Sequence, residues 1–311
     1  MKLYPLLLKP VVKTPIWSGK KLKTEWGIES DSETIGEAWM LTVRKVENNR
    51  IENGPLAGET LASVVDAYGA PAASFPLLIK LLNAQSALSV QVHPDDAYAA
   101  RVENDRGKTE MWHILEAEPD SELILGLRPG LTQVDFANAV RAGKLEDALN
   151  HIRVRAGETY FIPAGMPHAI GKGILLAEIQ QNCDLTYRIW DYNRLGTDGK
   201  PRELHVEKAL DVVRPFSVKE VETIRYEKEP DADRTTVLAA CKNFRVERRE
   251  INGAQTFQTP QGLCHLLCVN GEGKLECDGT AYPVCRGSSY LLPPAKAMRV
   301  SGNLTVLRSM A

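Results

Sequence analysis

Three short segments of the sequence carry side chains that could bind one metal ion. His93 ends a strand-like run, Glu110 lies in the next such run, and His168 follows Pro167 after a third. The chain has only six histidines in 311 residues, and two of them, His93 and His168, lie beside turn residues. Imidazoles and a carboxylate suit zinc best among common ions, and they leave positions for water or a substrate. If the three segments converge, we expect a catalytic metal site.

Strand geometry adds a fourth candidate ligand and sets one histidine aside. Residues two apart in a strand point to the same face, so the Gln91 amide projects together with His93. Glu110 and His113 lie on opposite faces of their strand, and we expect His113 to pack in the core. An inward-facing Glu110 would be costly unless it is paired or bound to a metal. The alternative is a surface ion pair between Glu110 and the neighbouring Lys108.

The other histidines and the cysteines have simpler interpretations. We expect His151 in a loop and His205 on an amphipathic helix, both facing solvent. His265 lies in 264–268, where alternation with apolar residues indicates a core strand rather than a zinc site. The six cysteines contain no Cys-x-x-Cys pair, so we expect them to be reduced and largely buried.

Strand patterns dominate the chain, and helical patterns appear in four places. Short runs rich in Val, Ile, Leu, Tyr and Trp alternate with Gly, Pro, Asn and Asp, which is typical of strands. The predicted strands include Ala38–Val46, Ala87–Val92, Thr109–Leu115, Val154–Ile162, Gly173–Gln180 and Thr186–Asp191. The predicted helices are Thr60–Tyr68, Asp95–Val102, Thr132–Arg141 and Glu203–Val213.

A weak internal repeat relates two parts of the chain. Residues 154–163 and 284–293 share Gly, Tyr and Pro at the same offsets. A turn at Gly, a buried strand and a terminating Pro are typical of cupin-type jelly-roll barrels. Eleven residues after the glycine, the first copy has His168 and the second has Met298. We therefore predict a metal site in the first barrel only.

The predicted fold is mainly β, with two cupin-type jelly-roll barrels and helical insertions. We assign residues 1–217 to a metal-binding cupin domain and residues 236–311 to a second, metal-free cupin-like domain. The charged stretch 218–235 is the predicted connection. A chain of 34.4 kDa is long enough for one large domain or two ordinary ones.

Composition excludes several classes of partner. The formal net charge of −2 argues against nucleic acid and against an anionic membrane surface. No apolar run approaches the roughly 18 residues of a membrane span. The apolar patch at Leu6–Leu8 is too short for a secretory signal and lacks a cleavage site. We expect a cytoplasmic protein, either a monomer or a dimer, that acts on a small molecule.

Arg188 is a further candidate for chemistry. It lies in the predicted strand Thr186–Asp191, after a polar loop. A guanidinium there could offer a planar fork of donors to a phosphate or a developing oxyanion. The alternative is a salt bridge to Asp184 or Asp191.

Several segments of the sequence, among them those that carry the candidate site residues, resemble the signature segments of type I phosphomannose isomerases. The similarity covers roughly residues 3–215, and beyond these residues only the cupin-like pattern persists. The length of the chain resembles that of the short bacterial form of the family. The segments that carry the resemblance are Leu88–Asp96, Gly107–Glu110, Pro163–Ile170 and Glu178–Gln181, followed by Asp184, Tyr187, Arg188 and Tyr192.

The resemblance implies interconversion of mannose 6-phosphate and fructose 6-phosphate at a zinc (Zn2+) site. Among the residues at matching positions, it implies the metal ligands Gln91, His93, Glu110 and His168. It also implies Arg188 as a catalytic residue and places Lys108 and Asp184 in the active site.

The reaction would move a proton between C1 and C2 through an enediol-like intermediate. Lys108 could bind phosphate or, with a lowered pKa, transfer the proton, and Asp184 could be the base or orient Arg188. Two rival functions are a different metal-dependent cupin enzyme, such as an oxygenase, and a non-catalytic cupin that binds sugar phosphates.

Overall fold

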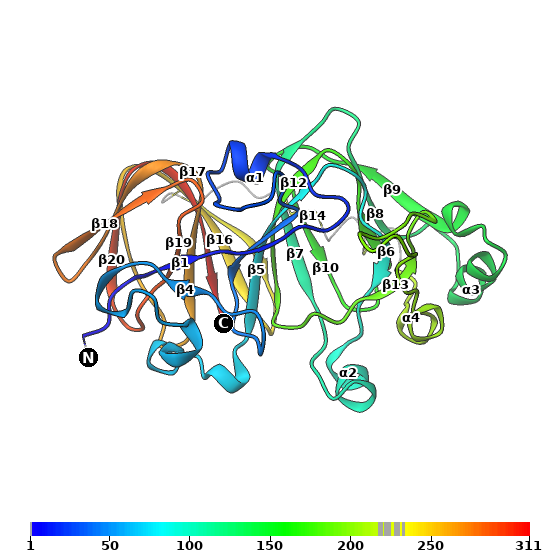
Figure 1. Cartoon of the computed structure of the whole chain (residues 1–311), viewed down its shortest axis with the longest axis horizontal. Helices are drawn as coiled ribbons and strands as arrows, with labels where there is room; N and C mark the ends of the chain where they lie inside the picture. Colours follow the sequence, from blue (N-terminus) through cyan, green and yellow to red (C-terminus); the bar gives the residue numbers. More distant parts are fainter. Residues whose placement is uncertain (1, 217–219, 221–224, 227–230, 232–233) are drawn as a thin grey trace.

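The computed structural model describes residues 2–216, 220, 225–226, 231 and 234–311. Most of the predicted connection 218–235 lies outside the described residues. Within the described part the prediction of a mainly β protein is confirmed, because strands form three antiparallel sheets and the helices lie at the periphery (Figure 1). The α-helices are α1 (Lys21–Thr24), α2 (Asp96–Val102), α3 (Gln133–Arg141) and α4 (Val206–Val212). Short 3-10 helices are Gly54–Leu56, Leu61–Ser63, Val65–Tyr68, Ala72–Ser74 and Leu145–Ala148.

Two sheets face each other across an apolar core, and together we call them the first unit. The seven-stranded sheet runs β14 (Arg225–Tyr226), β10 (Thr159–Ile162), β7 (Glu110–Ala117), β12 (Ile174–Gln181), β5 (Leu77–Ala84), β3 (Glu37–Leu41), β2 (Val11–Lys13). The five-stranded sheet runs β13 (Tyr187–Trp190), β6 (Val90–Val92), β11 (His168–Ile170), β8 (Glu122–Leu127), β9 (Leu149–Arg153).

A third sheet of eight strands forms what we call the second unit, on the left of Figure 1. Its strands run β15 (Thr235–Ala240), β16 (Arg245–Gln258), β20 (Ala297–Met310), β17 (Cys264–Cys277), β19 (Ser289–Leu291), β1 (Leu6–Lys9) and β4 (Arg50–Ile51), with β18 (Thr280–Cys285) on β17. The N-terminal strand β1 thus pairs with β19, Leu6 opposite Leu291, although the sequence division placed it in the first domain. This pairing ties the two ends of the chain together.

Strand β5 shows why the strands between the two units read as continuous apolar runs. Leu77, Ile79 and Leu81 pack in the core that the two units share. Leu82 packs inside the first unit, and Lys80 lines a cavity there. A strand covered on both faces has no solvent-facing residues to interrupt the run.

Two of the predicted helices are confirmed with their caps. The Asp95 side chain accepts a hydrogen bond from the Tyr98 N–H at the start of α2. Thr132 and Asp135 form a reciprocal capping box at the start of α3. The fourth predicted helix is shorter, because α4 begins at Val206.

Several other predicted elements differ in extent or type; strand β10, for example, begins at Thr159 rather than at Val154. The predicted helix Thr60–Tyr68 is instead two 3-10 helices, with the β-branched Val64 at their junction and the left-handed Gly69 (φ 78°) at the end. Strand β3 ends at Leu41 rather than Val46. The chain then turns, and the Arg44 N–H donates to the Glu47 carbonyl at 2.8 Å.

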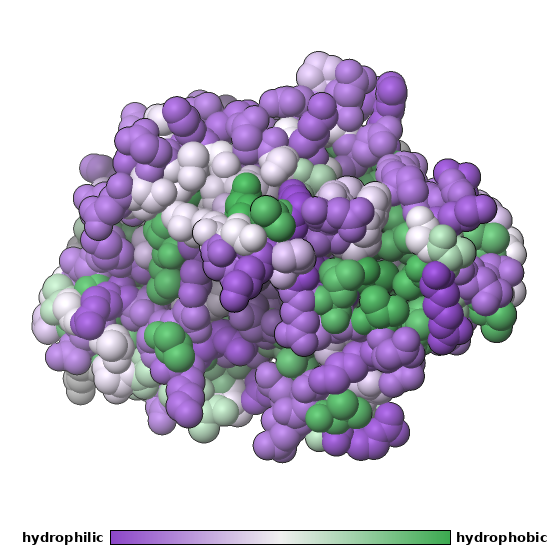
Figure 2. Space-filling view, turned by 45° about the vertical axis from the view of Figure 1, so that its right-hand side comes forward, coloured by the Kyte–Doolittle hydropathy of each residue, from purple (hydrophilic) through white to green (hydrophobic). Residues whose placement is uncertain are grey.

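The molecular face in Figure 2 is predominantly hydrophilic, and hydrophobic residues gather mainly toward its right-hand side. Among the described residues, no helix has the length and apolar character needed to span a membrane.

Candidate metal centre and active site

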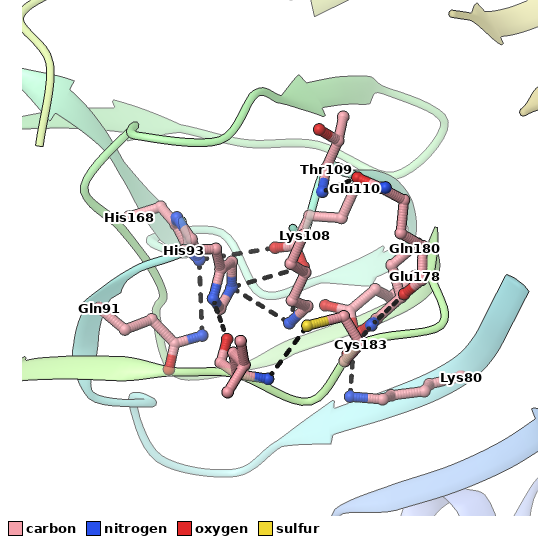
Figure 3. A network of polar contacts seen from close by, with 12 residues as sticks. Lys80, Gln91, His93, Lys108, Thr109, Glu110, His168, Glu178, Gln180 and Cys183 are labelled. Atoms are coloured by element: carbon pink, nitrogen blue, oxygen red, sulfur yellow. Dashed lines mark hydrogen bonds and ion pairs between the residues drawn. The ribbon is translucent and has the colours of Figure 1, made fainter. Parts of the chain in front are cut away.

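Three strands bring the predicted His and Glu ligands together. His93 directly follows β6, and Glu110 and His168 are the first residues of β7 and β11. The Nε2 atoms of His93 and His168 lie 3.6 and 3.5 Å from the two carboxylate oxygens of Glu110 (Figure 3). Across the part of the chain that the structure describes, no other group of three His, Cys, Asp or Glu side chains places its ligand atoms within 4.8 Å of one another.

Both histidines present the nitrogen that a metal would need. The Nδ1 atoms of His93 and His168 each lie 2.8 Å from a backbone carbonyl, of Leu185 and Met166 respectively. A carbonyl can only accept, so Nδ1 carries the proton and the Nε2 lone pair faces Glu110. Burial, then the Lys108 charge, lowers the pKa of His93 well below its usual value, and burial lowers the pKa of His168 to about 4. Both rings are therefore neutral near pH 7.

Glu110 is the residue that most clearly calls for a cation. Its side chain is fully buried, and neither oxygen accepts a well-aligned hydrogen bond from the described residues. Burial, then the nearby Glu178, raises the pKa of Glu110 to about 7. A buried carboxylate facing two neutral imidazoles is costly unless a positive charge compensates it. These three side chains therefore fit a divalent cation.

Lys108 already supplies one positive charge beside Glu110. Its Nζ lies 2.9 Å from Glu110 Oε2 and 3.1 Å from His93 Nε2. The alternative interpretation, a surface ion pair between Lys108 and Glu110, is wrong because both side chains are buried. Burial lowers the pKa of Lys108, but the charges of Glu110 and Glu178 outweigh burial and raise it. The structure thus differs from the expectation of a lowered pKa, because the lysine has carboxylate neighbours.

Gln91 reaches the same place from β6. It lies opposite His168 on one side and opposite Arg188 on the other. Its amide nitrogen lies 3.4 Å from His168 Nε2, and its amide oxygen lies 3.4 Å from Ser89 Oγ. The oxygen would face the metal group only after a 180° rotation of the amide, a change between nearly isosteric states. Its role as a ligand remains a prediction.

A polar cavity of about 340 Å³ adjoins this group, and we call it the polar cavity. The charged residues that line it and that the sequence analysis did not select include Lys80 and Glu178. Lys80 Nζ lies 3.2 Å from Glu178 Oε1 and 3.6 Å from Glu37 Oε2. Glu178 Oε2 also accepts a hydrogen bond from Trp112 Nε1 at 3.0 Å. The sequence feature that could have identified these two residues is the single charge within each of two otherwise largely apolar strands, β5 and β12.

Arg188 and Asp184 also line the polar cavity. Arg188 donates from Nη1 to the Glu203 carbonyl at 2.7 Å, and its buried Nε has no hydrogen-bond partner among the described residues. The alternative salt bridge to Asp191 is not formed, because that carboxylate pairs with Arg194 and Arg202. Asp184 is exposed.

The remaining histidines lie away from the metal group. His113 is buried on the opposite face of β7, 2.9 Å from Thr159 Oγ1, and burial lowers its pKa to about 3. His265 is buried in the second unit beside Ser289 Oγ, at 2.7 Å. His151 faces solvent as expected but lies in β9 rather than in a loop. His205 precedes α4 and is partly exposed.

Two family models match this chain. Residues 6–125 match the family model described as the catalytic domain of type I phosphomannose isomerase. Residues 233–311 match the model of the mannose-6-phosphate isomerase cupin domain.

Relatives cover almost the whole chain. The probable mannose-6-phosphate isomerase GmuF of Bacillus subtilis is 38% identical over 296 residues, 93% of each chain. The mannose-6-phosphate isomerase ManA of the same organism is 35% identical over 295 residues, also 93% of each. The crystal structure of a B. subtilis mannose 6-phosphate isomerase matches with a TM-score of 0.91 and 31% identity, covering 99% of this chain and 100% of the other. The chain therefore belongs to the type I phosphomannose isomerase family.

Proposed function

We propose that the chain is a zinc-dependent aldose–ketose isomerase that interconverts mannose 6-phosphate and fructose 6-phosphate through an enediol-like intermediate. The observation that supports this most strongly is the buried group of His93, Glu110 and His168 beside a charged cavity. Family membership supports the substrate, because the relatives named above are mannose-6-phosphate isomerases.

The proposed metal site belongs to the first unit. His93, Glu110 and His168 would hold the ion, with Gln91 as the fourth ligand after rotation of its amide. Two imidazoles and oxygen donors favour zinc among common ions. When bound, the ion would act as a Lewis acid toward the sugar oxygens. We also propose that residues 1–217 and 236–311 form two cupin-type barrels joined by 218–235, with metal in the first barrel only.

The chain's own residues would bind the sugar and handle its proton. Arg188 has spare donors that would stabilise negative charge on a sugar oxygen. Lys108, whose Nζ lies on the cavity wall beside Glu110, would donate a hydrogen bond to the substrate. Asp184, a carboxylate on the cavity wall, is then our candidate for the base that moves the proton between C1 and C2. Lys80, held by Glu178 and Glu37, would donate to a sugar hydroxyl.

A coupled assay of mannose 6-phosphate isomerisation tests this function. We expect turnover that is lost after chelation, is restored by zinc, and is absent in Glu110→Ala. Turnover that survives both treatments would contradict the metal mechanism. Binding of the sugar phosphate without turnover would instead favour a non-catalytic cupin, and faster turnover of another hexose phosphate would overturn the substrate.

A further inference from the structure

The polar cavity has a second arginine whose role the proposed function leaves open. Arg202 follows β13 in the chain and lines the cavity together with Arg188. Its guanidinium forms a two-point contact with Asp191, Nε to Oδ2 at 2.7 Å and Nη2 to Oδ1 at 2.6 Å. The Asp191 side chain is only 5% exposed. Such a fork fixes the plane of the guanidinium, and Nη1 of Arg202 has no hydrogen bond to the described residues.

The two arginines of the cavity do not use all of their hydrogen-bond donors on the protein. Arg188 uses Nη1 on the Glu203 carbonyl, whereas its Nε is buried without a hydrogen-bond partner among the described residues. Asp191 is shared, because it also accepts hydrogen bonds from Arg194. Burial lowers the pKa of Arg188, and the Arg202 charge lowers it further. Spare donors on two guanidinium groups in one wall suit a dianion.

We infer that Arg202, oriented by Asp191, binds the phosphate of the substrate. This inference rests on the proposed function, since it concerns the same sugar phosphate. The planar guanidinium would offer directed donors to phosphate oxygens, which the point charge of a lysine could not match. Asp191 would be a positioning residue, because its carboxylate is fully engaged by arginines.

Arg194 provides a matched control. It pairs with the same Asp191 oxygen, Nη2 to Oδ1 at 2.9 Å, but it does not line the polar cavity. Its guanidinium lies instead 5.3 Å from the ring centre of Tyr192. Removing either arginine thus takes one partner from Asp191, and only removal of Arg202 changes the cavity wall.

The test compares Arg202→Gln with Arg194→Gln in two measurements. In steady-state isomerisation of mannose 6-phosphate, we expect Arg202→Gln to lower kcat/KM by about 10- to 100-fold, mainly through KM, because one charged hydrogen-bonding group is lost. Calorimetry with inorganic phosphate on chelator-treated protein should show affinity at least about tenfold weaker than wild type. Arg194→Gln should stay within about twofold in both. If Arg202→Gln does not fold, Arg202→Lys replaces it and should show the same losses to a smaller extent.

The outcomes separate this inference from the proposed function. A wild-type protein without isomerase activity would reject the function, and the phosphate calorimetry would still test the site. Equal kcat/KM in the Arg202 and Arg194 variants of an active enzyme would overturn the inference. So would a wild-type protein that binds no phosphate, or one that binds it no better than Arg202→Gln.

Discussion

The two units contain the same turn in the same conformation. Gly157 and Gly287, the glycines that the two copies share, have φ angles of 92° and 89°. Eight residues later, Gly165 and Ala295 again both have left-handed backbones, with φ angles of 86° and 51°. The two copies therefore share left-handed backbone at the same two positions, and their chemical difference lies in the side chains that follow.

That difference appears three residues after the second turn. His168 is buried against the carboxylate of Glu110, whereas Met298 is buried in the apolar core of the second unit. The same core contains Cys264 and Cys268, and His265 lies on the opposite face of their strand. The two copies of the turn thus lead to a buried polar side chain in the first unit and to a buried apolar side chain in the second.

The largest expected effect comes from removing the charge of the metal group. Glu110→Gln keeps the shape of the side chain but removes the carboxylate, and we expect kcat/KM for mannose 6-phosphate to fall by at least about 1,000-fold. Met298→Leu, at the corresponding place in the second unit, should keep activity within about twofold, since it conserves volume in an apolar core. Similar activity losses in the two variants would break the comparison.

Met298→Ala tests whether this residue of the second unit contributes to stability rather than to activity. We expect unfolding free energy to fall by about 3 kcal/mol, because a fully buried side chain is replaced by a cavity. Activity per folded molecule should change little. Urea unfolding and active-site titration would measure the two effects, and a large loss of activity in folded protein would show that the second unit takes part in the reaction.

Much of this contrast could be predicted from the sequence. Strand alternation placed Glu110 and His113 on opposite faces of one strand, although it left open whether Glu110 points inward, and the repeat identified Met298 as the counterpart of His168. Lys80 and Glu178 were not selected, because their meeting depends on the register of β5 against β12, which local pattern does not reveal. The pairing of β1 with β19 joins residues far apart in the chain and was missed for the same reason.

Acid should destabilise the second unit through His265. Burial lowers the pKa of His265 to about 3, so the unfolded chain binds more protons below its ordinary value of 6.5. Stability from this residue is present above pH 6.5 and is lost as the pH falls toward 3, by about 2 kcal/mol between pH 7 and pH 5. In His265→Gln, the unfolding free energy should fall less steeply over that range, by a similar amount.

His151→Gln is the matched control for acid unfolding, because this side chain faces solvent. The slope measured for this variant is the reference for the slope of His265→Gln. An unchanged slope in His265→Gln would contradict the proposed burial of a neutral imidazole.

The smallest expected effect concerns the second turn of each copy. Ala295→Gly should stabilise the protein by about 0.5 kcal/mol, because relief of the left-handed strain exceeds the added entropy of the unfolded chain. Gly165→Ala should destabilise it by more than about 1 kcal/mol, since a Cβ there would lie 2.9 Å from the Val212 carbonyl oxygen. Thermal unfolding would measure the stability of both variants. Because the two substitutions are opposite, changes in stability of the same sign would show that the two turns are not equivalent.

The metal content of the purified protein tests the central claim most directly. Elemental analysis of wild type, His168→Ala and Met298→Leu, each loaded with zinc and freed of excess, should find about one zinc per chain in the wild type and in Met298→Leu. His168→Ala should retain less than about a tenth of that amount. Equal zinc in all three proteins, or none in the wild type, would contradict a metal site built from His93, Glu110 and His168 in the first unit.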